Sequence, residues 1–219
     1  MRKYKFLLII TAIFMLVFFS SCAELAGIQE LNQEPTLLEQ EPTLLEQELA
    51  LLEQDIKNIE QANAVAEEKA LQLMEQGFPI AIYEYYSATP NSVGGVNVII
   101  FWKNISPKDF KYVIFTVKPY NAVDDVVYCT ISHEADSRLK VTGPVKAKNM
   151  DEPSSSVWEN VWYNNTIKRI EIEQIDIIYM DNSEESISAS EVKEMFIDRH
   201  ALYDEFGVRS IDEMFGGKY

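Results

Sequence analysis

The fold is decided by the stretch Phe110-Lys111-Tyr112-Val113-Ile114-Phe115-Thr116-Val117-Lys118. Val113, Phe115 and Val117 share one parity along this stretch, and Tyr112 and Ile114 share the other. Because successive side chains of a strand point to opposite faces of its sheet, this pattern predicts a β-strand.

Similar short stretches occur on both sides of this strand, and residues typical of turns separate them. The expected strands are Ile80–Tyr86, Val96–Lys103, Lys111–Lys118, Asp125–Ser132, Arg138–Thr142, Val157–Trp162, Ile167–Tyr179 and Glu185–Ser188. Short strands at this spacing are typical of an antiparallel sandwich or barrel, and about 110 residues suit an immunoglobulin-like sandwich. We therefore expect a mainly β fold with helical additions, with an immunoglobulin-like antiparallel β-sandwich over residues 78–188.

The apolar pattern changes phase inside one of these strands. Ile170 and Ile172 share one parity, whereas Ile175 and Ile177 share the other. One extra residue near Glu173–Gln174 would bring both pairs to the same buried face, so we expect a β-bulge there.

Three stretches of the chain resemble a known kind of domain. The strand at 110–121 resembles small exported bacterial domains of the FxLYD-like, immunoglobulin-like kind, and 158–164 and 175–181 resemble late strands of lipoproteins with such domains. The resemblance covers about half of the chain. It implies an immunoglobulin-like fold and brings no catalytic residues with it.

A seven-residue repeat precedes the expected sandwich. Glu34-Pro35-Thr36-Leu37-Leu38-Glu39-Gln40 recurs identically at 41–47, and degenerate copies follow as far as Gln61. Seven residues is the coiled-coil period. The pattern places Leu49, Ile56, Asn63 and Ala70 at heptad position a, and Leu45, Leu52, Ile59, Ala66 and Leu73 at position d.

Proline and glycine give the expected bounds of this helix. Proline fits only the first turn of a helix, so a continuous helix should begin near Pro42 and end at Gly77, two residues before Pro79. Two interpretations of residues 42–77 remain open. The segment is a homo-oligomeric coiled-coil stalk in which Asn63 fixes the register, or it is a single amphipathic helix that is solvated or folded back on the sandwich.

The beginning of the chain has the layout of an export signal. Arg2, Lys3 and Lys5 are basic, residues 6–19 carry no charge, and Ser20-Ser21-Cys22 follows. The apolar run is short for a transmembrane helix, which needs about 20 residues. The layout resembles a bacterial lipoprotein signal peptide, although Phe19 stands where that motif usually carries leucine.

This resemblance implies removal of residues 1–21, acylation of Cys22 by chains such as palmitate, and a membrane tether over residues 22–41. A cleaved signal with a chance cysteine and an uncleaved anchor are the alternatives. Ala23 stands where an aspartate would retain a lipoprotein in the inner membrane, which favours the outer membrane of the cell envelope.

Composition excludes one class of partner. The chain has 19 Lys and Arg against 35 Asp and Glu, a formal net charge of −16. Such a charge repels nucleic-acid phosphates and anionic lipid headgroups, so acyl chains would be the only attachment to the membrane.

The last part of the chain, residues 189–219, is expected to be helical. Ser188-Ala189-Ser190-Glu191 predicts a capping box. One amphipathic helix with Val192, Met195, Phe196, Tyr203 and Phe206 on its apolar face would follow and end at Gly207. This helix packs on the sandwich, or it belongs to a partner-binding segment together with the apolar tail residues Met214 and Phe215.

No residue set predicts catalysis, a cofactor or a metal. His-x-x-x-His pairs, a Gly-x-Ser-x-Gly turn and a glycine-rich phosphate loop are all missing from the sequence. Trp158, Trp162 and Tyr163 are candidates for an exposed patch that contacts a protein or glycan, with packing in the core as the alternative. Cys129 has no predicted partner and is expected to be a buried thiol.

The sequence therefore predicts a membrane-anchored bacterial envelope lipoprotein that displays a non-enzymatic binding or structural module on a helical spacer. The alternative is an oligomeric scaffold of the envelope that acts through its coiled coil. An enzyme with an unrecognised site is a third possibility.

Overall fold

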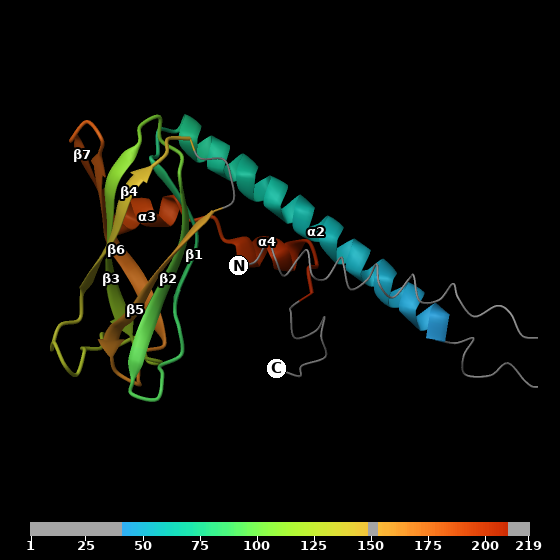
Figure 1. Cartoon of the computed structure of the whole chain (residues 1–219), viewed down its shortest axis with the longest axis horizontal. Coiled ribbons are helices and arrows are strands. Elements are labelled where there is room, and N and C mark those ends of the chain that lie inside the picture. The colour runs from blue at the N-terminus through green and yellow to red at the C-terminus, as the bar shows by residue number, and fades with distance from the viewer. Residues whose placement is uncertain (1–40, 149–152, 210–219) are drawn as a thin grey trace, which may run out of the picture. The chain divides into compact units, whose positions relative to one another are not determined.

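The computed structural model describes residues 41–148 and 153–209. The first described element is α2 (Glu41–Glu75), which confirms the predicted long helix before the sandwich (Figure 1). Gly77 ends the helix with a φ of +90°. Its N–H donates to Met74 O at 3.1 Å and the N–H of Phe78 donates to Leu73 O at 3.0 Å, which is the Schellman arrangement expected after a C-terminal glycine. The signal peptide, Cys22 and the tether up to residue 40 lie outside the described residues.

Two antiparallel sheets follow, as the strand pattern predicts. One sheet has the order β1-β2-β5 and the other the order β4-β3-β6-β7. The strands are β1 (Ile80–Ser87), β2 (Gly95–Asn104), β3 (Phe110–Tyr120), β4 (Ser137–Val145), β5 (Ser154–Tyr163), β6 (Arg169–Tyr179) and β7 (Glu184–Ser188). Lettered A to G in chain order, they form sheets A-B-E and D-C-F-G. The immunoglobulin constant arrangement has A-B-E-D and C-F-G, so only the fourth strand lies in the other sheet.

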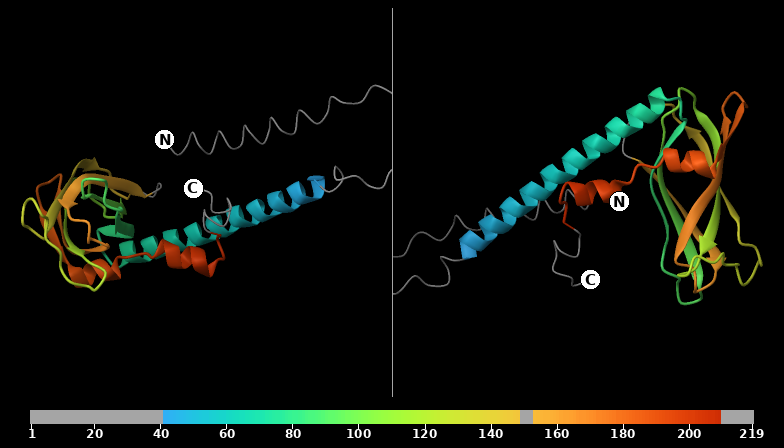
Figure 2. Two further views of the ribbon diagram at one scale, coloured as in Figure 1. Left: turned by 90° about the horizontal axis from the view of Figure 1, so that it is seen from below. Right: turned by 180° about the vertical axis from the view of Figure 1, so that it is seen from behind.

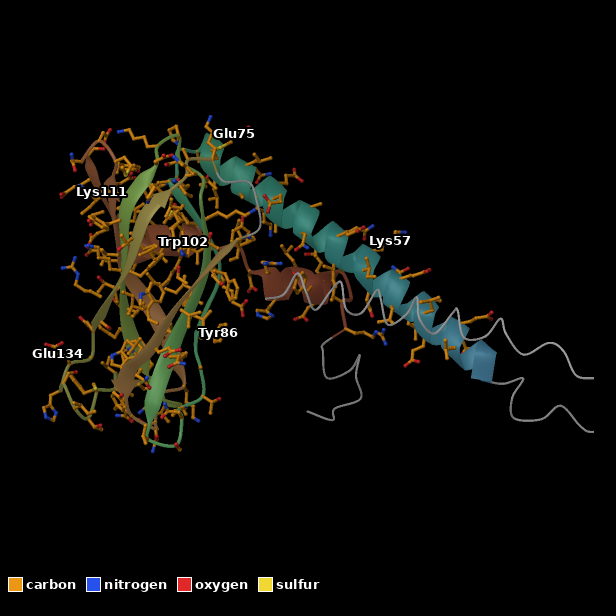
Figure 3. All side chains as sticks on the ribbon, viewed as in Figure 1. Lys57, Glu75, Tyr86, Trp102, Lys111 and Glu134 are labelled. Atoms are coloured by element: carbon orange, nitrogen blue, oxygen red, sulfur yellow. The ribbon has the colours of Figure 1, made fainter. Side chains whose placement is uncertain are left out.

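The main core fills the space between the sheets. Trp102 of β2, labelled in Figure 3, lies in this core. Its ring stacks on Phe110 with 6.4 Å between ring centroids and meets Phe115 edge-on at 5.7 Å. All three side chains are buried. The alternation of β3 turns Val113, Phe115 and Val117 toward the opposite sheet, and the register shift between Phe110 and Tyr112 brings Phe110 into the same core.

The predicted β-bulge is present in β6. Thr116 of β3 is paired with Gln174, and the next residue, Val117, is paired with Ile172, so Glu173 is the extra residue. The isoleucines on both sides of the bulge are buried in the same core. The bulge therefore corrects the phase of the strand, as the sequence predicts.

The predicted strand Asp125–Ser132 is wrong. Only an isolated bridge joins Val126 to Tyr120, and the chain between β3 and β4 is otherwise a loop. The Asn121 side chain accepts hydrogen bonds from the N–H groups of Val123 and Asp125 at 2.9 and 3.0 Å and closes a turn. This turn ends β3 and folds the chain back beside it, where the N–H of Val127 donates to Pro119 O at 3.0 Å without forming a further strand.

The prediction of one continuous C-terminal helix is also wrong. Two short helices, α3 (Ala189–Glu194) and α4 (Arg199–Glu205), flank a segment that pairs with the edge of β1. The N–H of Ile82 donates to Met195 O at 3.1 Å, and the N–H of Ile197 donates to Ile82 O at 2.7 Å. The predicted capping box at the start of α3 is present, and Gly207, with a φ of +67°, ends α4.

These two helices occupy different places in the fold. α3 contacts β6 and β7, and its Val192 belongs to the core between the sheets. α4 lies beside α2, where Leu202 packs with Ala62 and Ala66, and the views of Figure 2 agree on this position. Over the described ranges, no helix combines the length and apolar character that a membrane span requires.

Candidate functional site

A groove of about 800 Å³ lies beside the loop that joins β3 to β4. Glu134 marks this loop in Figure 3. The lining combines two cations, two acids, a tyrosine and small residues, and consists of Lys118, Val126, Tyr128, Glu134, Ala135, Asp136, Ser137 and Arg138. Concave sites with a few polar groups beside apolar ones are typical of binding sites.

The backbone of this loop is held by contacts with distant strands. The N–H of Thr130 donates to Tyr163 O at 2.9 Å, and the amide of Asn164 donates to Tyr128 O at 2.9 Å. At its start, Arg169 Nε donates to Asp124 Oδ1 at 2.9 Å. The loop is therefore anchored to β5, to the residue after it and to β6 rather than loosely attached.

Several large apolar side chains of the anchored loop point into solvent. Tyr128 is 60% exposed, Ile131 is 66% exposed and Val123 is 73% exposed. A rigid backbone that presents apolar side chains is typical of binding loops on sandwich scaffolds. This arrangement favours contact with a partner more than catalysis.

Both cations of the groove are paired with acids. Lys118 Nζ lies 3.7 Å from Asp136 and 3.8 Å from Glu173, and Arg138 donates to Asp176 at 3.0 Å. Neither cation is therefore left unpaired to attract a strongly anionic ligand.

Cys129 lies under this loop and is 4% exposed. Burial alone would raise the pKa of its thiol, but hydrogen bonds from Ser132, Tyr163 and Ile131 outweigh burial and lower the pKa to about 7. The N–H of Tyr163 donates to Sγ at 3.4 Å. The thiol thus acts as an internal acceptor, in agreement with the buried position expected from the sequence.

The aromatic residues singled out in the sequence do not form one exposed patch. Trp162 is 1% exposed, and its indole N–H donates to Ala135 O at 2.7 Å. Trp158 is half-buried, lies edge-on to Phe115 at 6.0 Å and donates to Lys140 O at 3.3 Å. Core packing, the alternative interpretation, therefore describes Trp162. Contact of Trp158 and the half-buried Tyr163 with a partner stays a prediction.

The remaining predicted site residues, Cys22, Met214 and Phe215, lie outside the described residues. Among residues 41–148 and 153–209, no three or more His, Cys, Asp or Glu side chains are grouped to hold a metal ion.

Sequence reasoning missed the exposed apolar residues of the loop because Val126, Val127 and Ile131 have the composition of a strand. The signal that could have found the loop is Asn121 followed by Asp124-Asp125, since these residue types favour turns.

Comparison of the chain with protein-family models, with curated proteins and with solved structures finds no match in any of the three. The interpretation of function below therefore depends on the chain's own residues and geometry.

Proposed function

We propose that this chain is a lipid-anchored protein of the bacterial cell envelope, in which a helical spacer carries a non-enzymatic β-sandwich that binds a partner. The observation that carries the proposal is Phe19-Ser20-Ser21-Cys22 at the end of an uncharged run. Stable anchoring takes about two acyl chains, since each buried methylene contributes about 0.8 kcal/mol. An acylated Cys22 supplies that anchor.

The junction between helix and sandwich supports the role of α2 as a spacer. Lys103 of β2 is 1% exposed and forms an ion pair with Glu67 of α2. Ala66 and Ala70 are 3% and 0% exposed, and such small side chains let the helix approach the outer face of β1 and β2 closely. The helix from Leu49 onward therefore belongs to the same compact unit as the sandwich.

The groove beside the β3–β4 loop supports a binding role. The loop has an anchored backbone and exposes Tyr128 and Ile131, and the cations of the groove beside it are paired with acids, which suits a protein or glycan surface that is not strongly anionic.

Metabolic labelling with an alkyne fatty acid tests the anchor. The full chain should carry the label in the membrane fraction, and a Cys22→Ser variant should carry none. An unlabelled wild-type product, or one released into the medium, would contradict the proposal.

Site-specific photo-crosslinking tests the binding surface in cells. A photoreactive residue at Ile131 should capture a defined partner, whereas one at Met180, which is 52% exposed between β6 and β7, should not. Equal capture from the two positions would show that the loop has no binding role.

A further inference from the structure

The N-terminal half of α2 has an apolar face that the described chain leaves largely uncovered. Leu49 is 45% exposed and Ile56 is 47% exposed, while Leu52 and Ile59 are half-buried. These four residues occupy successive a and d positions of the heptad repeat. We call them the uncovered seam, and Lys57 marks this part of α2 in Figure 3.

The same heptad face is covered farther along the helix. Ala66, Ala70 and Leu73 pack against the sandwich and α4. Asn63, at position a, accepts hydrogen bonds from Arg199 at 3.0 Å and from Tyr203 at 3.3 Å. Asn63 is therefore engaged within the chain, and the uncovered seam ends near Ile59.

The residues beside the seam carry one sign of charge. Every e and g position from 46 to 60 is acidic, and the set is Glu46, Glu48, Glu53, Asp55 and Glu60. In a pair of coiled-coil helices the e and g residues of one helix lie beside those of the other and determine partner choice. If a second copy of this chain paired with the seam, parallel or antiparallel, acidic residues would lie beside acidic residues. A partner helix with lysine or arginine at its e and g positions would form ion pairs instead.

One of the acidic residues beside the seam already pairs with a cation of the same chain. Arg209 Nε donates to Asp55 Oδ2 at 2.9 Å, and Asp55 is 5% exposed. An arginine is thus the residue through which the C-terminal segment of the chain contacts the acidic residues beside the seam.

We propose that the uncovered seam binds a basic amphipathic helix of a partner protein, with apolar residues in heptad spacing and Lys or Arg at its e and g positions. The seam already lies on a formed helix, so binding does not have to order it. This interaction surface goes beyond the proposed function, and it requires neither acylation of Cys22 nor a ligand in the groove.

The probes are two synthetic helical peptides of four heptads, both with Ile at a and Leu at d. One has Lys at every e and g position and the other has Glu. Binding is measured by fluorescence anisotropy with the full chain in phosphatidylcholine nanodiscs, and empty nanodiscs serve as the blank. The basic peptide should bind at least tenfold more tightly than the acidic one.

A matched pair of variants separates the seam from general charge attraction. Ile56→Asp removes a seam residue, whereas Leu51→Asp adds the same charge at position c, off the seam, where Leu51 is 51% exposed. Ile56→Asp should weaken binding of the basic peptide at least tenfold, and Leu51→Asp should change it less than twofold. Circular dichroism of both variants checks that helix content is unchanged.

Four results would each overturn the proposal. Equal binding of the two peptides, or equal effects of the two variants, would mean that the seam does not select a basic helix. A dimer of the full chain in sedimentation equilibrium that Ile56→Asp abolishes would assign the seam to a second copy. Peptide binding that appears only after deletion of residues 210–219 would assign it to the chain's own tail.

Discussion

The ion pair between Lys103 and Glu67 gives the sharpest test of how α2 is held on the sandwich. Lys103 is 1% exposed, and its ammonium contacts the Glu67 carboxylate and lies 5.4 Å from the centre of the Tyr83 ring. Glu67→Gln keeps the size of the side chain and removes its charge. The lysine is then left buried beside a neutral amide.

The magnitude follows from the burial of the two partners. Removing one member of a fully buried ion pair costs about 3–5 kcal/mol, because the other charge remains without compensation. The side chain of Glu67 is 38% exposed, so water replaces part of the lost interaction. We expect a loss of about 2 kcal/mol in the free energy of unfolding, and in a chain of this size about 2–4 °C in Tm for each kcal/mol.

Urea denaturation followed by circular dichroism measures this loss. Glu68→Gln, at the next position of α2 and exposed, is the matched control and should change stability by less than about 0.5 kcal/mol. Lys103→Met in the Glu67→Gln background removes the buried charge and should recover most of the stability. The reasoning is refuted if Glu67→Gln costs no more than Glu68→Gln, or if the double variant is less stable than the single one.

Three further predictions concern packing, pH and backbone space. Ala70→Leu places a large side chain where α2 meets the sandwich, and it should lower the free energy of unfolding by about 1–3 kcal/mol, measured by thermal denaturation. Ala64→Leu, on the exposed face of α2, should be nearly neutral. Equal effects of the two variants would contradict this packing. The pKa of Cys129 is about 7, below the ordinary value of a thiol. The ionised thiol therefore stabilises the folded chain above about pH 8.5, and this stabilisation is lost as the pH falls through 7. The excess stability of the wild type over Cys129→Ala should therefore be greater at pH 9 than at pH 6, by at most about 2 kcal/mol, and a difference independent of pH would contradict this. A Cβ on Gly143 would lie 2.2 Å from the carbonyl oxygen of Phe110, whereas a Cβ on Gly77 would have no neighbour within 4 Å. Gly143→Ala should therefore destabilise the chain more than Gly77→Ala, which should cost about 1 kcal/mol because of its positive φ. The reverse order in thermal denaturation would contradict the strand geometry.

Most of the sandwich could be predicted from the sequence because strand alternation is a local pattern. Seven of the predicted strands lie where β1 to β7 lie, and even the bulge at Glu173 follows from the slip in the spacing of neighbouring isoleucines. The end of α2 is equally local, since Gly77 donates to Met74, three positions earlier, and Phe78 donates to Leu73, five positions earlier.

The wrong predictions all concern segments whose partners lie far away in the chain. The residues around Cys129 have strand composition, but Thr130 bonds to Tyr163 and leaves the loop outside both sheets. The apolar face expected of one C-terminal helix is real, yet Met195 and Ile197 bond to Ile82 and break it into two. No window of sequence includes both ends of such contacts, so the groove beside the loop could not be predicted either.

The contacts of α2 with the C-terminal segment have a consequence for the order in which the protein acquires its structure. Arg199 reaches Asn63 across 136 positions, and Arg209 reaches Asp55 across 154. During synthesis, α2 leaves the ribosome well over a hundred residues before Arg199 and Arg209. Part of its apolar side therefore stays open until the segment with these two arginines has been made, and a change in that segment would alter the stability of a helix far earlier in the chain.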